Sequence, residues 1–186
     1  LTYAINVDEP KILIYYGLMG SGKSKNSKRF AENFPAVRIN TDEFRKSYFS
    51  KALTDKVYES FNEGIYSLEN SKIIYREISR VTEEYLKLKR MVLVDGSFSK
   101  RVFYDIFSQN LKTTPVKILF KTSDEESIKR LSKRLDDASI SDGRPELYYK
   151  QKETFEDIGH DLVVDTMGEL DFNVAKVRDF LIDNEK

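Results

Sequence analysis

The sequence contains no cysteine and a single histidine, His160. The absence of cysteine excludes disulfide bonds, zinc–thiolate sites and thiol nucleophiles, and a single histidine excludes metal sites built from several imidazoles. An excess of one charge is also missing, because 31 acidic residues balance 31 basic ones. No global field therefore attracts nucleic acid or a membrane surface, although the balance does not exclude a local basic channel.

Long apolar runs are missing as well. No run approaches the length of a membrane span, and the N-terminus lacks a signal-peptide pattern, so we expect a soluble cytoplasmic protein with no membrane partner. A chain of 186 residues is long enough for one α/β domain with a full core. We predict a single domain over residues 1–186, with its core at about 11–184. The chain begins at Leu1 rather than Met, which suggests a domain cut from a longer protein.

The most specific pattern is the stretch 17–24, whose sequence is G-L-M-G-S-G-K-S. It fits the phosphate-binding P-loop, G-x-x-x-x-G-K-[ST], between an apolar strand-like run and a helix-prone segment. Glycines let backbone N–H groups point into one concavity that holds phosphate oxygens, and the following helix adds its positive dipole end. The predicted nucleotide-binding residues here are Gly17, Gly20, Ser21, Gly22, Lys23 and Ser24, with Lys23 on the β- and γ-phosphates and Ser24 on Mg²⁺.

The rest of the chain alternates between short β-rich runs and helical patterns. The β-rich runs are 11–16, 36–40, 91–95, 115–120 and 161–165. This alternation predicts an α/β protein with a five-stranded parallel sheet covered by helices on both faces, which is the three-layer P-loop NTPase fold. One helical stretch carries an apolar stripe that we expect to face the core, formed by Ile74, Ile78, Val81, Tyr85 and Leu88.

Ligands of such sheets bind beyond the carboxyl ends of the strands. Asp95 ends the third apolar run and is the predicted second metal residue; Asp165 ends the fifth and competes for that role. A guanine-reading [NT]-K-x-D motif, typical of GTPases, is absent from the sequence. Gly96 follows Asp95, whereas a motor-type ATPase usually has glutamate there, so the pattern favours a kinase.

A kinase needs a base for the hydroxyl acceptor and cations over the phosphates. Asp42 follows the second strand at the start of a helix, which we expect Thr41 or Asp42 to cap, and Arg45 lies on the same helical face. Asp42 is the candidate base, and Arg45 the candidate contact to an anionic group of the substrate. The alternative is that Asp42 only caps the helix and pairs with Arg45 at the surface.

Arg130 and Arg134 share one face of a helix that leads into the turn-rich segment 136–145, and we predict a short lid at about 130–146. Either arginine is a candidate clamp on the transferring phosphoryl group. The alternative is a solvated basic face that also contains Lys129 and Lys133.

The order of four motifs resembles a known group of enzymes. G-L-M-G-S-G-K-S, I-N-T-D-E-F-R-K, V-L-V-D-G-S-F-S-K-R and I-K-R-L-S-K-R follow one another as in the P-loop kinases grouped with polynucleotide 5′-kinase, zeta toxin and chloramphenicol phosphotransferase. The resemblance implies an aspartate that activates the acceptor hydroxyl, at Asp42, and a substrate-contacting arginine, at Arg45. It also implies paired lid arginines, at Arg130 near the adenine and Arg134 near the phosphates, and an adenine pocket lined by backbone around Thr166.

We therefore predict an ATP- and Mg²⁺-dependent phosphotransferase that moves the γ-phosphoryl group to a hydroxyl of a small molecule or a nucleic acid. The third strand ends D-G-S where polynucleotide kinase has D-x-N, so a polynucleotide is only one option for the acceptor. Two alternatives remain open: an ATP-binding regulatory or slow ATPase module without a dedicated acceptor, and a toxin-like kinase acting on sugar nucleotides.

Overall fold

The computed structural model describes residues 11–53, 63–135 and 143–184, the side chains of residues 134 and 135 excepted. Its centre is a five-stranded sheet in the order β2-β3-β1-β4-β5, in which every neighbouring pair is parallel. The strands are β1 (Ile12–Tyr16), β2 (Ala36–Asn40), β3 (Met91–Asp95), β4 (Val116–Lys121) and β5 (Leu162–Asp165). The predicted parallel α/β sheet is confirmed, and each strand lies within one residue of its predicted run.

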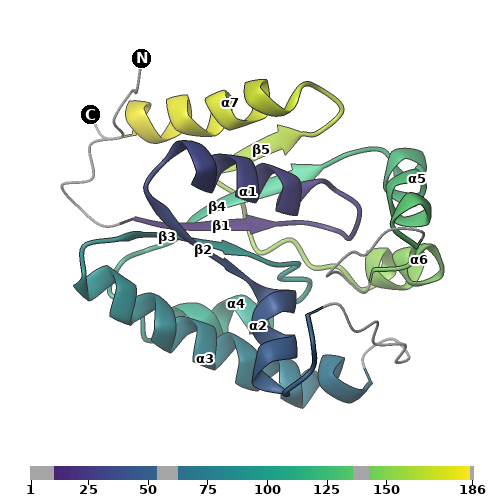
Figure 1. Cartoon of the computed structure of the whole chain (residues 1–186), viewed down its shortest axis with the longest axis horizontal. Helices are drawn as coiled ribbons and strands as arrows, with labels where there is room; N and C mark the ends of the chain where they lie inside the picture. Colours follow the sequence, from purple (N-terminus) through teal and green to yellow (C-terminus); the bar gives the residue numbers. More distant parts are fainter. Residues whose placement is uncertain (1–10, 54–62, 136–142, 185–186) are drawn as a thin grey trace.

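Helices cover both faces of the sheet (Figure 1). Helices α1 (Lys23–Asn33) and α7 (Leu170–Asp183) lie on one face, and α2 (Thr41–Tyr48), α3 (Leu68–Lys87) and α4 (Arg101–Ser108) lie on the other. A 3-10 turn, η1 (Gly64–Tyr66), precedes α3. Helices α5 (Asp124–Leu135) and α6 (Pro145–Glu153) lie beyond the carboxyl end of the sheet, beside the loop that joins β1 to α1.

Two apolar clusters form the core, one on each face of the sheet. Alternation along β1 separates them, since Leu13 and Tyr15 face α1 and α7, whereas Ile12, Ile14 and Tyr16 face α3 and α4. All five β1 side chains are buried, as expected for the central strand of a doubly covered parallel sheet.

The apolar stripe predicted for the long middle helix is only partly correct. Ile74 and Ile78 are fully buried on α3, and Val81 and Tyr85 pack against the same cluster. Leu88, however, is 69% exposed, because α3 ends at Lys87 and the chain turns away toward β3 at that point.

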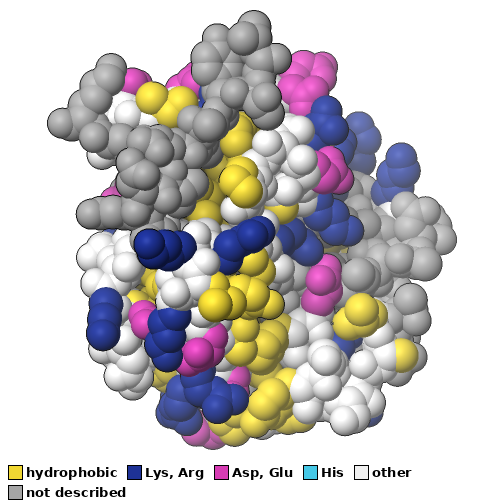
Figure 2. Space-filling view, turned by 60° about the vertical axis from the view of Figure 1, so that its left-hand side comes forward, with side chains coloured by type: hydrophobic (Ala, Val, Ile, Leu, Met, Phe, Trp, Pro, Cys, Tyr) yellow, Lys and Arg dark blue, Asp and Glu magenta, His cyan; other side chains and the backbone are white. Residues whose placement is uncertain are grey.

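Within the described ranges, no helix combines the length and apolar character that crossing a membrane requires. On the face shown in Figure 2, Lys and Arg side chains are interspersed with Asp and Glu around exposed apolar atoms. The balance of charge in the sequence is thus repeated locally on that face.

Candidate active site

The loop between β1 and α1 has the backbone geometry of a phosphate cradle. Gly17, Gly20 and Gly22 all have positive φ angles, of 141°, 78° and 86°. At Gly22, the N-cap of α1, an added Cβ would also lie 3.0 Å from Nη1 of Arg130 and 3.1 Å from Oγ1 of Thr166. Any other residue would be strained there and would crowd both neighbours, so the second glycine of the motif is required by conformation and by space.

Lys23 is the first residue of α1, and its side chain folds back over the loop. Its Nζ donates a hydrogen bond of 3.2 Å to the carbonyl oxygen of Leu18. The ammonium group therefore lies above the same loop whose amides form the cradle, close to the positive end of the α1 dipole. This combination of charges favours a polyanion over any neutral ligand.

The two predicted metal residues lie together although 71 positions separate them. Ser24 Oγ lies 3.3 Å from Oδ1 of Asp95, and Asp95 is fully buried. A hydroxyl and a carboxylate oxygen are ligands that suit Mg²⁺, which commonly binds through few protein groups together with phosphate oxygens and water. No cluster of three acidic or histidine side chains exists among the described residues, so a metal here would depend on the nucleotide for further ligands.

Asp165, the competing carboxylate, is in a different environment. It is exposed at the end of β5 and its Oδ1 accepts a hydrogen bond of 2.9 Å from the backbone N–H of Met167. Its position caps the turn into α7, whereas Asp95 faces the P-loop serine. Geometry therefore favours Asp95 as the metal-side carboxylate.

Asp42 lies in the first turn of α2, but neither it nor Thr41 is the cap that the sequence led us to expect. The N-cap is Asn40, whose side-chain oxygen accepts from the N–H groups of Asp42 and Glu43 at 3.0 and 2.9 Å. Because the capping role belongs to Asn40, the Asp42 carboxylate is not needed for it. The half-buried Asp42 side chain can thus serve another purpose.

The negative charge of Asp42 acts on a tyrosine of α3. Burial raises the pKa of Tyr75 to about 12, and the Asp42 charge adds a small increase, while the Arg45 guanidinium, the N–H of Phe98 and the side chain of Ser97 oppose it. The Asp42 charge and the Tyr75 hydroxyl thus interact electrostatically between α2 and α3. That hydroxyl accepts a hydrogen bond of 3.3 Å from the backbone N–H of Phe98, in the loop after β3.

The loop after β3 connects this region to the P-loop. The N–H of Gly17 lies 3.4 Å from the carbonyl oxygen of Ser97. The next residue, Phe98, is fully buried and has a φ of 42°, a conformation that bulky residues rarely adopt. A strained loop thus connects the P-loop to Tyr75 on α3, through the carbonyl of Ser97 and the N–H of Phe98.

Arg45 is buried rather than part of a surface ion pair. It is 5% exposed, its Nη1 donates to the carbonyl oxygen of Ile65 at 2.6 Å and to Ser71 Oγ at 3.2 Å, and its guanidinium lies 4.9 Å from the centre of the Tyr66 ring. Its Nε is buried and has no hydrogen-bond partner in the part of the chain that the structure describes. Arg45 therefore joins α2 to η1 and α3.

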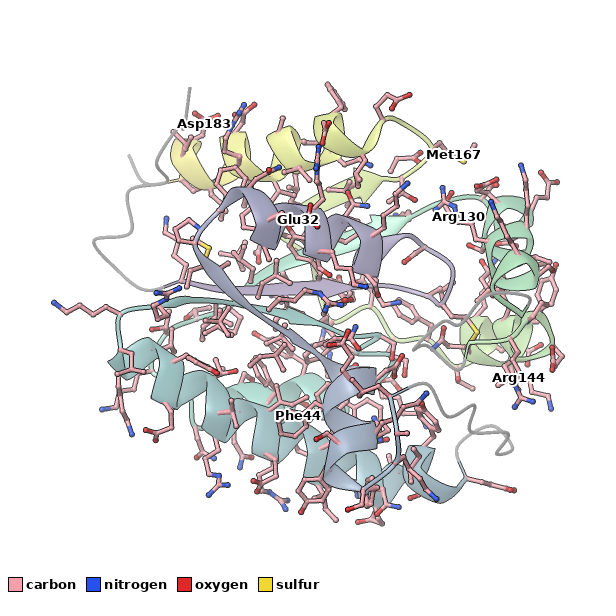
Figure 3. The ribbon with its side chains drawn as sticks, in the orientation of Figure 1. Glu32, Phe44, Arg130, Arg144, Met167 and Asp183 are labelled. Carbon is pink, nitrogen blue, oxygen red and sulfur yellow. The ribbon has the colours of Figure 1, made fainter. Side chains whose placement is uncertain are left out.

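Arg130 and Thr166 meet at the P-loop. Arg130 donates from Nη1 to Oγ1 of Thr166 at 2.8 Å and from Nη2 to its carbonyl oxygen at 2.9 Å, and Thr166 Oγ1 donates to the carbonyl oxygen of Ser21 at 2.8 Å. Figure 3 shows Arg130, at α5, and Met167, after β5, on the same side of the P-loop. Arg130 thus differs from Lys129, whose side chain is 80% exposed and belongs to the solvated face.

The second lid arginine cannot be compared in the same way. The backbone of Arg134 lies in α5, but its side chain and residues 136–142 of the predicted lid lie outside the described residues. Helix α6, on the far side of that segment, contacts the P-loop directly, because Oε1 of Gln151 accepts a hydrogen bond of 2.7 Å from the N–H of Met19.

Three residues of this region were not predicted from the sequence: Arg38, Asn40 and Gln151. Arg38 is the ion-pair partner of Asp95, at 2.8 Å. Arg38 and Asn40 lie two residues apart on β2, so both side chains point to the same face, toward α1. The alternation of these two polar residues with the apolar Val37 and Ile39 along β2 is a signal that could have indicated Arg38 and Asn40.

A glycine-rich phosphate loop after the central strand and a carboxylate at the end of the neighbouring strand, on this five-stranded parallel sheet, define the α/β P-loop kinase-like fold. The family described as the AAA domain matches residues 12–158, and the chain belongs to that family. No curated protein matches the sequence.

Solved structures share the fold over nearly the whole chain at low identity. An unliganded sugar kinase from Janibacter sp. HTCC2649 aligns with a TM-score of 0.71 and 15% identity, over 92% of this chain and 94% of that one. An APS kinase from Mycobacterium tuberculosis, in complex with AMPPNP and APS, aligns at 0.67 and 16%, over 93% and 98%. A gluconokinase from Sinorhizobium meliloti 1021 aligns at 0.63 and 22%, over 94% and 93%. At these identities the similarity establishes the fold, and the acceptor must be argued from the site.

Proposed function

We propose that the protein is an ATP-dependent phosphotransferase that moves the γ-phosphoryl group to a hydroxyl acceptor. The observation that carries this proposal is the arrangement around Asp95, whose Oδ1 faces the P-loop serine at 3.3 Å while its Oδ2 binds the side chain that caps the helix of Asp42. The P-loop serine and the N-cap of the helix that carries the candidate base thus both contact one buried carboxylate. A module that only binds ATP has no need of a carboxylate at the position of Asp42.

In the proposed reaction, the amides of the P-loop and Lys23 hold the triphosphate, and Ser24 and Asp95 would hold Mg²⁺, which neutralises charge on the β- and γ-phosphates. Asp42 accepts the proton of the acceptor hydroxyl as the new O–P bond forms, and the bond from the γ-phosphorus to the bridging oxygen breaks to release ADP. Arg130 holds the P-loop against the loop of Thr166 on the nucleotide side, and Arg134 is assigned to the phosphates as part of the lid.

The enclosed guanidinium of Arg45 supports an acceptor that carries an anionic group. The Arg45 residue is 5% exposed, and none of the ion pairs among the described residues involves its guanidinium. A buried cation is costly unless a negative group compensates it, and the Nε of Arg45 still has a hydrogen bond to donate. The closer kinship with polynucleotide 5′-kinase, zeta toxin and chloramphenicol phosphotransferase rests on motif order and is part of this proposal.

The test is transfer from γ-labelled ATP to pools of nucleosides, oligonucleotides, sugars, sugar nucleotides and aminoglycosides. We expect the wild type to label one pool in the presence of Mg²⁺. Asp42→Asn, which keeps the size of the side chain but not its basicity, should lower transfer about 10²–10⁴-fold while ATP binding is unchanged. Release of free phosphate alone with every pool would contradict the proposal and favour the regulatory or slow ATPase module.

A further inference from the structure

The side chain of Asn40 uses both of its polar ends. Its Oδ1 caps α2 by accepting from the N–H groups of Asp42 and Glu43, and its Nδ2 donates a hydrogen bond of 2.9 Å to Oδ2 of Asp95. One amide therefore joins the first turn of the helix that carries Asp42 to the carboxylate beside Ser24. The β2–β3 register makes this contact, since it places Asn40 directly opposite Asp95.

The two oxygens of Asp95 have different surroundings. Oδ2 accepts from Nδ2 of Asn40, from Nη2 of Arg38 and from Oγ of Ser27, at 2.9, 2.8 and 2.8 Å, whereas Oδ1 faces Ser24. Three donors on one oxygen fix the plane and orientation of the carboxylate, as the outer contacts of a metal ligand do. The other oxygen is thereby directed toward the P-loop.

Few side chains can replace Asn40 in this double contact. Serine, threonine and aspartate can cap a helix, but serine and threonine are shorter, and aspartate would bring a second carboxylate against Asp95. Arg38 reinforces the same connection, since its guanidinium also contacts Glu43 in the first turn of α2 at 3.1 Å and Ser27 on α1 at 2.8 Å.

We propose that Asn40 is a positioning residue for phosphoryl transfer, whose amide holds the metal-side carboxylate of Asp95 and the base-carrying helix α2 in one fixed arrangement. The proposal rests on the proposed function, because it assigns the metal side to Asp95 and the base to Asp42. It adds the connection between them. Asn40 contacts neither nucleotide nor acceptor in this scheme and acts through its two neighbours.

The test compares Asn40→Asp, Asn40→Ser and a matched capping variant, Ser67→Ala, which removes the cap of α3 at Asn70 N. Binding of a fluorescent ATP analogue is measured with Mg²⁺ and with EDTA, and transfer is resolved into kcat and the KM for ATP. N40D places a second carboxylate against Asp95, and N40S is too short to keep both contacts, so both variants remove the amide donor from Oδ2 of Asp95.

We expect N40D and N40S to lower kcat for transfer and to weaken Mg²⁺-dependent ATP binding about tenfold, while binding in EDTA stays within about threefold of the wild type. S67A should lose thermal stability but bind and transfer as the wild type does. N40D and N40S that match S67A in kcat and in Mg²⁺-dependent binding would overturn this inference alone. A wild-type protein that binds no ATP would overturn the proposed function, and this inference with it, before any variant is compared.

Discussion

Gly96, the residue after β3, lies directly against Thr41, the first residue of α2. A Cβ atom added at Gly96 would lie 2.4 Å from Cγ2 and 2.8 Å from Oγ1 of Thr41. The close approach lets the end of β3 and the start of α2 lie side by side, and Asp95 and Asp42 are the sequence neighbours of these two residues. The close packing against Thr41 therefore explains why glycine follows Asp95 at the end of β3.

Gly96→Ala is expected to push α2 away from β3 and to destabilise the fold by about 1–3 kcal/mol, the usual cost of overpacking. Transfer should fall more than ATP binding, because the substitution displaces the helix of Asp42 and leaves the P-loop in place. Urea unfolding and the labelled-ATP assay measure the two effects. The control is Gly168→Ala, where an added Cβ meets nothing within 4 Å; equal losses in both variants would contradict the packing argument.

The sheet could be predicted from the sequence because its two most buried strands, β1 and β3, are short apolar runs. The runs at 12–16 and 91–95 contain little else, and local pattern alone determines such strands. The P-loop could also be recognised from the sequence, because its residues are contiguous. The order of the strands and the position of each helix on one face or the other came only from the structure.

The contacts between distant residues of the candidate site could not be predicted in this way. Asn40, Thr41 and Asp42 are all good N-cap residues, so propensity could not choose among them. The choice is made by the β2–β3 register, which brings Asn40 beside Asp95 across 55 positions of sequence. The pairing of Arg38 with Asp95 likewise depends on tertiary proximity across 57 positions.

Lys23→Ala is expected to lower turnover at least about 10²-fold, because it removes a charge that stabilises the transferring group. The structure places Nζ of Lys23 over the P-loop, 3.2 Å from the carbonyl oxygen of Leu18, on a half-buried side chain outside the apolar core, so the variant should fold normally. Single-turnover kinetics measure the loss. Lys25→Ala, at an exposed position of the same helix, is the control and should retain wild-type turnover; a similar loss in both would indicate a general charge effect.

Gln151→Leu is expected to destabilise the P-loop, although Gln151 lies on α6 and is not one of the predicted phosphate-binding residues. It removes the oxygen that accepts the Met19 N–H at 2.7 Å, and an unpaired backbone donor costs about 1–2 kcal/mol of folding stability. ATP affinity should fall as well, since the loop loses its contact with α6. Thermal unfolding and titration with an ATP analogue measure the two effects.

Gln151→Glu separates the hydrogen bond from charge at the same position. It keeps an acceptor for Met19, so stability should stay near that of the wild type, while the added negative charge beside the triphosphate weakens ATP binding. Gln109→Leu, at an exposed glutamine after α4, should change neither quantity. Unchanged stability and ATP affinity in Q151L would show that α6 does not support the P-loop.

The contact between α5 and α6 is expected to weaken in acid. Asp124 accepts hydrogen bonds from Nζ of Lys152 at 2.5 Å and from the Tyr148 hydroxyl at 2.8 Å, and these two bonds, that of Lys152 foremost, hold the pKa of Asp124 below its ordinary value. Because the pKa of the folded state is lower than that of the unfolded chain, near 4, the stabilisation is present above about pH 4. It is lost as the pH falls through the folded-state value.

Titration of the Asp124 carboxyl by NMR measures this pKa directly, and thermal unfolding between about pH 3 and 6 measures its effect on stability. Asp124→Asn should be less stable than the wild type at pH 6, and the two should converge toward pH 3. In Lys152→Met the pKa of Asp124 should rise, because the hydrogen bond that lowers this pKa most is removed and only the bond from Tyr148 remains. A pKa that is the same in K152M as in the wild type would mean that Lys152 does not hold α6 against α5 in solution.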